Sequence, residues 1–323
     1  MRCILESNLP YGNHRVTLLA GGVGGARMAR ALRTVVDPGL LTIVVNVGDD
    51  TERYGVHVAA DPDTVLHTLA DDVGPHGWGR ADDTFTIMDE LERHGIDTRF
   101  RLGDRDFGSC LARTTMLAAG HTLSETLDAA RMSLAIEDVA ILPASDDPVR
   151  TWLRAMGTGE WIPFQEYFVD RSHDMDIDGV EYRGAASAHA APGVVAAIDQ
   201  ADTLVIAPSN PPLSIWPILA VDAIAEAVRR HPRTVAVSPL FGGKPVKGPA
   251  DRVMAGLGLP PGTAGVIEAY AGLAQCLFVD TADRADRDLA DATGIAIEAV
   301  DTLLSGPDGG RACAEAVVSW GRR

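Results

Sequence analysis

Four aspartates lie within fifteen residues near the start of the chain. Asp49 and Asp50 follow an apolar run in the stretch NVGDD, and Asp61 and Asp63 lie in the stretch ADPDT. Taken singly, an aspartate in such a position is best explained as a helix cap or part of a solvated turn. Mg²⁺ prefers one or two carboxylates together with substrate phosphates and water. Beside a phosphate loop, the cluster therefore predicts a magnesium-binding or hydroxyl-binding role.

A glycine-rich stretch precedes this cluster. Residues 21–25 read Gly-Gly-Val-Gly-Gly between an apolar run and a stretch rich in alanine and arginine. Glycines between a strand and a helix let the backbone approach a phosphate, which the N–H groups of the helix then bind. Arg27 replaces the third glycine of the dinucleotide fingerprint, and no Gly-Lys-Ser/Thr follows. We predict a phosphate loop of another kind made by Gly22, Gly24, Gly25 and Arg27, with a tight turn that binds nothing as the alternative.

Three further loops carry side chains that suit an anionic ligand. Arg101 opens the charged loop RLGDRD, whose alternative role is a salt-bridged surface turn. Ser209 and Asn210 follow an apolar run and offer neutral donors, unless the loop is a plain strand exit. The two lysines of the chain, Lys244 and Lys247, share one glycine-rich loop. The residues predicted here to bind a nucleotide or phosphate are Ser209, Asn210, Gly243 and Lys244.

Patterns for covalent or zinc chemistry are missing from the sequence. Its nine histidines form no HxxxH or HExxH pattern, and there is no GxSxG elbow. The cysteines Cys3, Cys110, Cys276 and Cys313 form no CxxC pair and are typical of reduced thiols. An enzyme with this inventory would position two substrates rather than form a covalent intermediate.

The elements that carry these residues alternate between strand and helix. An apolar run at 16–20, a helical stretch at 26–36 and a β-branched run at 40–47 form a βαβ unit. Further strands are predicted at 203–207, 234–237, 276–279 and 295–297, and helices at 83–94, 108–117, 124–132 and 216–230. The pattern predicts an α/β fold with a parallel sheet.

The stretch 152–184 interrupts this alternation. It is aromatic, acidic and irregular, which favours a short β-rich insertion or cap. We predict a discontinuous nucleotide-binding domain made of residues 16–150 and 185–305. An inserted lobe at 151–184 and a C-terminal helix at 306–323 complete the predicted organisation.

Composition limits the partners of the protein. The 323 residues carry a formal charge of −17, which argues against a general nucleic-acid binder with its basic face. No apolar run approaches the length of a membrane-spanning helix, and the first fifteen residues lack a continuous apolar segment typical of a signal peptide. We expect a cytoplasmic enzyme that acts on small molecules without nucleic-acid or membrane partners, and a homodimer because small oligomers are most often twofold.

Eight motifs together resemble one family over residues 16–304. In order along the chain they are GGVGGAR, NVGDD, DPDT, RLGDRDFG, LPASDDPV, FQEYFV, APSNPPLSI and SPLFGGKPVKGPAD. This order is similar to that of the CofD/FbiA family, the 2-phospho-L-lactate or phosphoenolpyruvate transferases of coenzyme F-420 biosynthesis. The resemblance implies a Rossmann-like sheet with helices on both faces and a smaller inserted lobe.

The resemblance also implies a reaction. The acceptor would be the deazaflavin FO, and the donor a guanosine diphosphate ester of lactate, enolpyruvate or a related acid (LPPG or EPPG). The ribityl hydroxyl of FO would attack the phosphorus that bears the organic acid. GMP would leave, and coenzyme F-420-0 or its dehydro form would result, with Mg²⁺ required.

The same resemblance assigns roles to individual residues. Asp63 and Arg101 match the family positions that contact FO, and Asp63 would orient or deprotonate the hydroxyl, with Asp50 as a second catalytic candidate. Asp49, Asp50 and Asp61 are the candidate metal ligands, and the aromatic segment 161–168 would cover the flat deazaflavin. The donor acid stays open. The alternatives are another magnesium-dependent nucleotide-diphosphate transferase and a non-enzymatic nucleotide-binding regulator.

Overall fold

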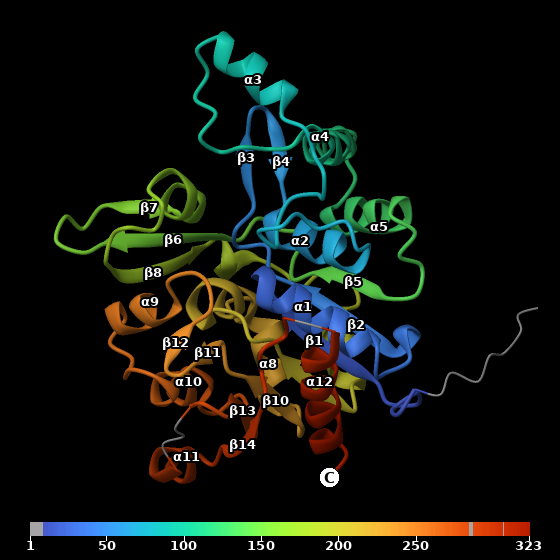
Figure 1. The fold of residues 1–323 in the computed structure, drawn as a ribbon, viewed down its shortest axis with the longest axis vertical. Coiled ribbons are helices and arrows are strands. Elements are labelled where there is room, and N and C mark those ends of the chain that lie inside the picture. Colours follow the sequence, from blue (N-terminus) through green and yellow to red (C-terminus); the bar gives the residue numbers. More distant parts are fainter. Residues whose placement is uncertain (1–8, 284–286, 306) are drawn as a thin grey trace, which may run out of the picture.

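The structure, a computed structural model, describes residues 9–283, 287–305 and 307–323. Its centre is a seven-stranded sheet with the order β14-β13-β10-β9-β1-β2-β5, in which all neighbouring strands are parallel (Figure 1). The strands are β1 Val16–Ala20, β2 Leu41–Val45, β5 Ala140–Pro143, β9 Thr203–Ile206, β10 Thr234–Val237, β13 Cys276–Asp280 and β14 Ala296–Val300. The predicted α/β fold with a parallel sheet is confirmed.

Helices cover both faces of this sheet. Successive residues of a strand point to opposite faces, so Leu18 and Leu19 of β1 belong to two different apolar clusters. The helices of the first cluster are α1 Gly22–Arg33, α2 Ala60–Leu69, α5 Leu123–Ser133 and α12 Pro307–Gly321. Those of the second are α6 Val194–Gln200, α8 Asp222–Arg230, α10 Thr263–Tyr270 and α11 Arg287–Thr293. The strands β1, β9, β10 and β13 are therefore buried throughout, which explains their continuous apolar runs, whereas the edge strand β14 stays partly exposed.

The helix boundaries correct two predictions. The helix predicted at 26–36 begins earlier, at Gly22, so most of the glycine stretch is the first turn of α1 rather than a free loop. The helix predicted at 216–230 is broken. It is divided into the short helix α7 Trp216–Leu219 and α8, and a π-helical turn, Pro211–Ile215, precedes α7.

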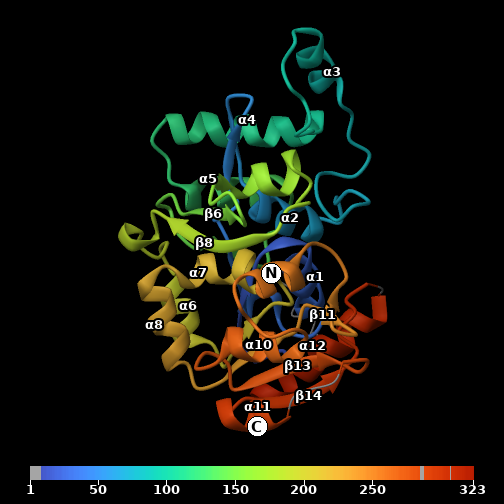
Figure 2. The same ribbon diagram turned by 90° about the vertical axis from the view of Figure 1, so that its left-hand side faces the viewer.

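Two smaller units stand beyond the carboxyl ends of the strands. The first is an antiparallel sheet from the predicted insertion, with β6 Arg150–Ala155 between β7 Trp161–Pro163 and β8 Ile177–Arg183. The second, which the sequence analysis did not separate from the main domain, joins a hairpin to two helices. Its elements are β3 Thr51–Arg53, β4 Val56–Val58, α3 Thr86–Arg93 and α4 Asp104–Ala118. Figures 1 and 2 show α3 and α4 at the end of the molecule far from β14.

The remaining elements are short. A two-stranded ribbon, β11 Leu240–Phe241 with β12 Lys244–Pro245, precedes α9 Ala250–Gly256. Among the described residues, no single helix has both the length and the apolar character needed to cross a membrane. Residues 211–219 and 222–230 meet those criteria only when counted together, and they are bent by 96°.

Candidate functional site

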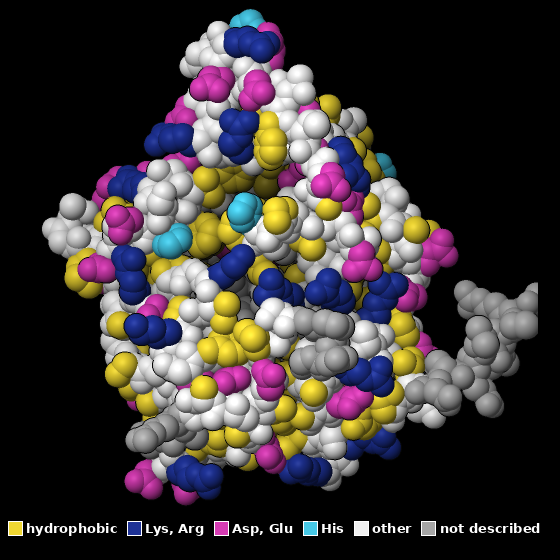
Figure 3. Space-filling model, in the orientation of Figure 1, with side chains coloured by type: hydrophobic (Ala, Val, Ile, Leu, Met, Phe, Trp, Pro, Cys, Tyr) yellow, Lys and Arg dark blue, Asp and Glu magenta, His cyan; other side chains and the backbone are white. Residues whose placement is uncertain are grey.

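A cavity of about 1170 Å³ lies between the sheet and the two smaller units. Its floor includes Gly21 and Asp49, which come shortly after β1 and β2, and Ser209, which comes shortly after β9. Open α/β sheets bind ligands at this edge, outside the carboxyl ends of their strands. Figure 3 shows the mouth as a hollow in one face of the molecule, with Lys and Arg side chains along its lower edge.

Three helices begin at this cavity. The first residues of α1, α2 and α4 all line it, including Gly22, Ala60 and Asp106. Helix N-termini present N–H groups and a partial positive charge, so they favour anionic ligands. In α4 the Asp83 carboxylate already accepts from the N–H groups of Arg105 and Asp106. This arrangement offsets part of the negative charge that the aspartates bring to the site.

The glycines at the start of α1 have different roles. Gly22 adopts φ +61°, a left-handed conformation that strongly favours glycine. A Cβ on Gly24 would collide with the carbonyl oxygen of Pro208, so Gly24 permits the close approach of the two loops. Gly22, Gly24 and Arg27, which the sequence analysis assigned to a phosphate loop, line the cavity. Gly25 does not; it is buried against Ala20 of β1 and serves packing.

Three aspartates, Asp49, Asp61 and Asp63, form one side of the cavity, here called the carboxylate wall. All three are buried, with exposed fractions of 5%, 5% and 7%. None is a solvated turn, and no side chain caps α2, so the simple alternatives for these residues are wrong. Asp50 is also buried but lies outside the cavity lining, where its carboxylate meets His57 Nε2 at 3.2 Å.

The residues of the carboxylate wall fit a divalent cation. Asp49 Oδ1 is buried without a hydrogen-bond partner among the residues that the structure describes. Burial raises the pKa of Asp49 well above its usual range, and the neighbouring charge of Asp61 raises it further. Burial also raises the pKa of Asp61 to about 6, although the Asn46 amide donates to its carboxylate at 2.9 Å. A cation between Asp49 and Asp61 would relieve this repulsion.

Asp63 is held by an arginine that the sequence analysis did not identify. Arg113 Nη1 donates to Asp63 Oδ2 at 3.0 Å, and Nη2 donates to Oδ1. Both side chains are buried, and Arg113 also donates to the His57 carbonyl at 3.2 Å. Arg113 lies one helical turn after Cys110, on the buried face of α4. An arginine at an apolar helical position was the one signal that could have revealed it.

The loop after β9 connects the sheet to the glycine turn. Ser209 Oγ donates to the Gly21 carbonyl at 2.6 Å, and Asn210 Oδ1 accepts from the Leu213 N–H at 3.3 Å. Both residues, which the sequence analysis assigned to nucleotide or phosphate binding, line the cavity. Each therefore positions the local backbone as well as facing the ligand space.

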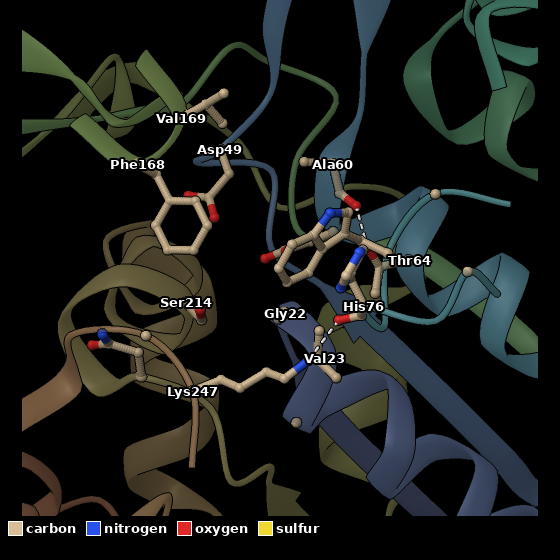
Figure 4. A pocket seen from close by; sticks show the side chains of 18 of the residues that line it. Gly22, Val23, Asp49, Ala60, Thr64, His76, Phe168, Val169, Ser214 and Lys247 are labelled. Atoms are coloured by element: carbon tan, nitrogen blue, oxygen red, sulfur yellow. Dashed lines mark hydrogen bonds between the residues drawn. The ribbon is translucent and has the colours of Figure 1, made fainter. Parts of the chain in front are cut away.

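The lysine loop places its two cations differently from the prediction. Gly243 and Lys244 lie outside the cavity lining, because β11 and β12 fold into a ribbon that leaves Lys244 exposed to solvent. Lys247 lines the cavity instead. Its Nζ donates to the His76 carbonyl at 2.8 Å and lies 5.4 Å from the centre of the Trp78 ring. Figure 4 shows Lys247 reaching toward Val23 and His76.

Arg101 reaches the cavity from the segment between α3 and α4. Its guanidinium donates to Asp89 at 3.0 Å and sits 4.9 Å from the centre of the Phe85 ring. Both Arg101 and Phe85 line the cavity and are exposed. Trp78, Arg101 and Lys247 together are called the rim below.

Aromatic side chains from the inserted lobe face the carboxylate wall. Phe164 and Phe168 stack with ring centres 5.3 Å apart, and both line the cavity. Figure 4 shows Phe168 beside Asp49. From the predicted aromatic segment 161–168, Trp161 lies outside the lining and instead lies 5.7 Å from the Arg154 guanidinium.

Comparison with known proteins identifies the family. Residues 16–301 match the sequence model described as 2-phospho-L-lactate transferase CofD. The chain is 42% identical over 302 residues to a phosphoenolpyruvate transferase of Kitasatospora aureofaciens, covering 90% of this chain and 92% of that protein. It is 33% identical over 302 residues to a 2-phospho-L-lactate transferase of Methanosarcina acetivorans, covering 93% and 97%. A crystal structure of a UPF0052 family member from Bacillus halodurans has the same fold, with a TM-score of 0.64, 17% identity and coverage of 94% and 99%. The chain therefore belongs to the 2-phospho-L-lactate transferase CofD family and is a transferase.

Proposed function

We propose that the protein transfers a phospho-lactyl or phosphoenolpyruvyl group from a guanosine diphosphate-linked donor to the ribityl hydroxyl of FO. GMP leaves, and coenzyme F-420-0 or its dehydro form is the product. The observation that carries this proposal is one cavity with two unlike sides, an aromatic one and an anion-binding one. Its volume of about 1170 Å³ exceeds the usual 300–1,000 Å³ of a single-ligand pocket, so two substrates fit.

The donor diphosphate occupies the side made by the helix N-termini. Gly22 and Gly24 line this side in the first turn of α1, and Arg27 and Lys247 supply positive charge. At the same edge, the Ser209 hydroxyl holds the Gly21 backbone in place. These groups bind a diphosphate through N–H donors and cations, which is how proteins hold nucleotide phosphates without a Walker motif.

The deazaflavin occupies the aromatic side. Phe164 and Phe168 offer a stacked apolar surface for a flat ring, and Phe85 with Arg101 offers a second one. Asp63 then meets the ribityl chain, with its carboxylate orientation set by Arg113. A carboxylate held in this way positions a hydroxyl without needing to form a covalent bond to it.

Asp49 and Asp61 are the residues that would hold Mg²⁺. When bound there, the ion would neutralise charge on the transferred phosphoryl group. The proposal requires no protein nucleophile, because phosphoryl transfer depends mainly on positioning and charge neutralisation. Higher identity to the phosphoenolpyruvate transferase than to the 2-phospho-L-lactate transferase favours the phosphoenolpyruvyl donor.

The test is a turnover assay with defined substrates. The protein is incubated with FO, Mg²⁺ and each guanylylated phospho-acid in turn, and GMP release and the mass of the deazaflavin product are measured. Equal molar amounts of GMP and F-420-0 or dehydro-F-420-0 are expected, with loss of both when the metal is chelated. Nucleotide turnover with an unmodified FO mass would favour another nucleotide-diphosphate transferase. Nucleotide binding with no turnover for any donor would favour the regulator.

A further inference from the structure

Asp106 is a cavity residue to which the proposed function has so far given no role. It lies in the first turn of α4, and its side chain lines the cavity. Asp106 Oδ1 is buried and has no hydrogen-bond partner within the described part of the chain. Its backbone N–H donates to Asp83 Oδ2 at 3.1 Å, so the main chain is fixed while the carboxylate keeps a free oxygen.

The charged groups around Asp106 compensate Asp63 but not Asp106. Asp63 faces it from α2, Cys110 and Arg113 from its own helix, and Arg80 and Asp83 from the segment before α3. Arg113 donates to both oxygens of Asp63. The one buried guanidinium of the group therefore serves Asp63, and Asp106 is the carboxyl left free to take up a proton.

This group is better suited to a proton than to a metal ion. One ligand atom each of Asp63, Asp106 and Cys110 lies within 4.8 Å of the others, a spacing that a metal could use. Burial raises the pKa of the Cys110 thiol, so the sulfur stays protonated and is a poor ligand. Arg113 already supplies the positive charge that Asp63 requires.

We propose that Asp106 accepts the proton of the acceptor hydroxyl while Asp63 orients that hydroxyl. The inference rests on the proposed function. The O–H bond of the ribityl hydroxyl breaks, and its proton passes to the Asp106 carboxylate. The hydroxyl oxygen forms the new bond to the donor phosphorus, and the bond from that phosphorus to the GMP oxygen breaks, with the electron pair leaving on GMP.

The geometry supports separate roles for Asp63 and Asp106. A hydroxyl oxygen forms hydrogen bonds of about 2.5–3.0 Å, so one hydroxyl spans two carboxylate oxygens up to 4.8 Å apart. Burial, with the nearby Asp63 charge as a second cause, raises the pKa of Asp106 to about 7. A general base with a pKa near the working pH combines a useful ionised fraction with sufficient basicity.

The test compares Asp106→Asn with a matched variant, Asp71→Asn. Asp71 is exposed and lies outside the cavity lining, and its φ of +54° is a conformation that asparagine accepts readily. For Asp106→Asn we expect kcat to fall about 100-fold, with the KM for FO changed less than about threefold. The wild type should lose kcat/KM below about pH 7 as Asp106 becomes protonated, and the variant should lack this acidic limb. Asp71→Asn should keep the wild-type rate and pH profile.

Several results would overturn the inference. These are a kcat within threefold of wild type, an unchanged acidic limb, or a rise in the KM for FO with kcat intact. Restoration of the rate by excess Mg²⁺ would indicate a metal ligand instead. Binding of FO, followed by its fluorescence, shows whether the variant keeps a folded site. Loss of binding together with loss of fold moves the test to Asp106→Glu, which keeps a titrating carboxyl; a wild-type rate without the acidic limb in this variant counts against the role. An inactive wild type would refute the proposed function, whereas an active wild type with an equally active Asp106→Asn would refute this role alone.

Discussion

The carboxylate wall and the rim of the cavity differ in burial and in the kind of element that carries them. The wall residues Asp49, Asp61 and Asp63 are at most 7% exposed, whereas Trp78 on the rim is 50% exposed. The wall is part of the sheet-and-helix core, directly after β2 and at the start of α2. The rim belongs to long connecting segments. Substitutions in the wall should therefore affect both the stability of the fold and the site, whereas substitutions in the rim should have little effect on stability.

The largest effect is expected from breaking the buried ion pair behind the wall. Arg113→Met should lower the free energy of unfolding by about 3–5 kcal/mol, because it leaves the Asp63 side chain buried without its partner. Urea denaturation measures this loss. The double variant Asp63→Asn, Arg113→Met should recover most of the stability. A double variant as unstable as the single one would mean that shape, not charge, holds this part of the wall.

The glycine turn tests how tightly the wall is built. Gly24→Ala should cost about 1–3 kcal/mol, because the new Cβ must push α1 away from the Pro208 carbonyl. Gly108→Ala is the control. Gly108 is exposed within α4 with no atom within 4 Å of the added Cβ, so this change should stabilise the protein by about 0.5–1 kcal/mol. Thermal unfolding of the two variants should move in opposite directions, and equal shifts would remove the packing explanation.

Substitution of each of the two lysines tests whether a cation must lie on the rim to bind the donor. Lys247→Ala should raise the KM for the anionic donor about tenfold, since one charge-assisted hydrogen bond is worth roughly 1.5–3 kcal/mol. Lys244→Ala removes the same charge outside the cavity lining and should leave the KM nearly unchanged. Steady-state kinetics at fixed ionic strength measure the KM for the donor in both variants. Equal effects of the two changes would point to general electrostatic attraction rather than a contact.

The smallest effect is expected at the outer edge of the rim. Arg101→Ala should change the free energy of unfolding by less than about 1 kcal/mol, because its pairs with Asp89 and Phe85 are exposed. The KM for FO should nevertheless rise about threefold to fivefold through the loss of a stacking cation. A KM unchanged from wild type would restrict Arg101 to a surface ion pair, the alternative that its sequence context already suggested.

The sequence predicted the strands of the central sheet far better than the site around it. Central strands are short apolar runs buried on both faces, so hydrophobic pattern alone locates them. The wall aspartates were found because they directly follow such a strand or open a helix. Arg113 was missed because its partner, Asp63, is fifty residues away in the chain, and no local pattern reports that distance.

The lysine loop shows the same limit at the rim. Lys244 and Lys247 lie three residues apart in one glycine-rich loop, so the local sequence does not distinguish them. In the structure, however, Lys247 lines the cavity and Lys244 is exposed to solvent. The two-residue strands β11 and β12 decide which one points inward, and their pairing has no signature beyond its glycines. The separate unit of β3, β4, α3 and α4 went unrecognised for a similar reason. Its small apolar core joins residues from Val56 to Cys110, which only packing brings together.

The sequence by itself determined the α/β class, the parallel strands and the presence of acidic and glycine motifs at their ends. These follow from local periodicity and from the chemistry of neighbouring residues. Only the tertiary structure decided which aspartates share the cavity, which cation reaches it, and that Asp106 keeps a free oxygen beside Asp63. Such choices depend on contacts between residues far apart in the chain, where burial and charge compensation act together.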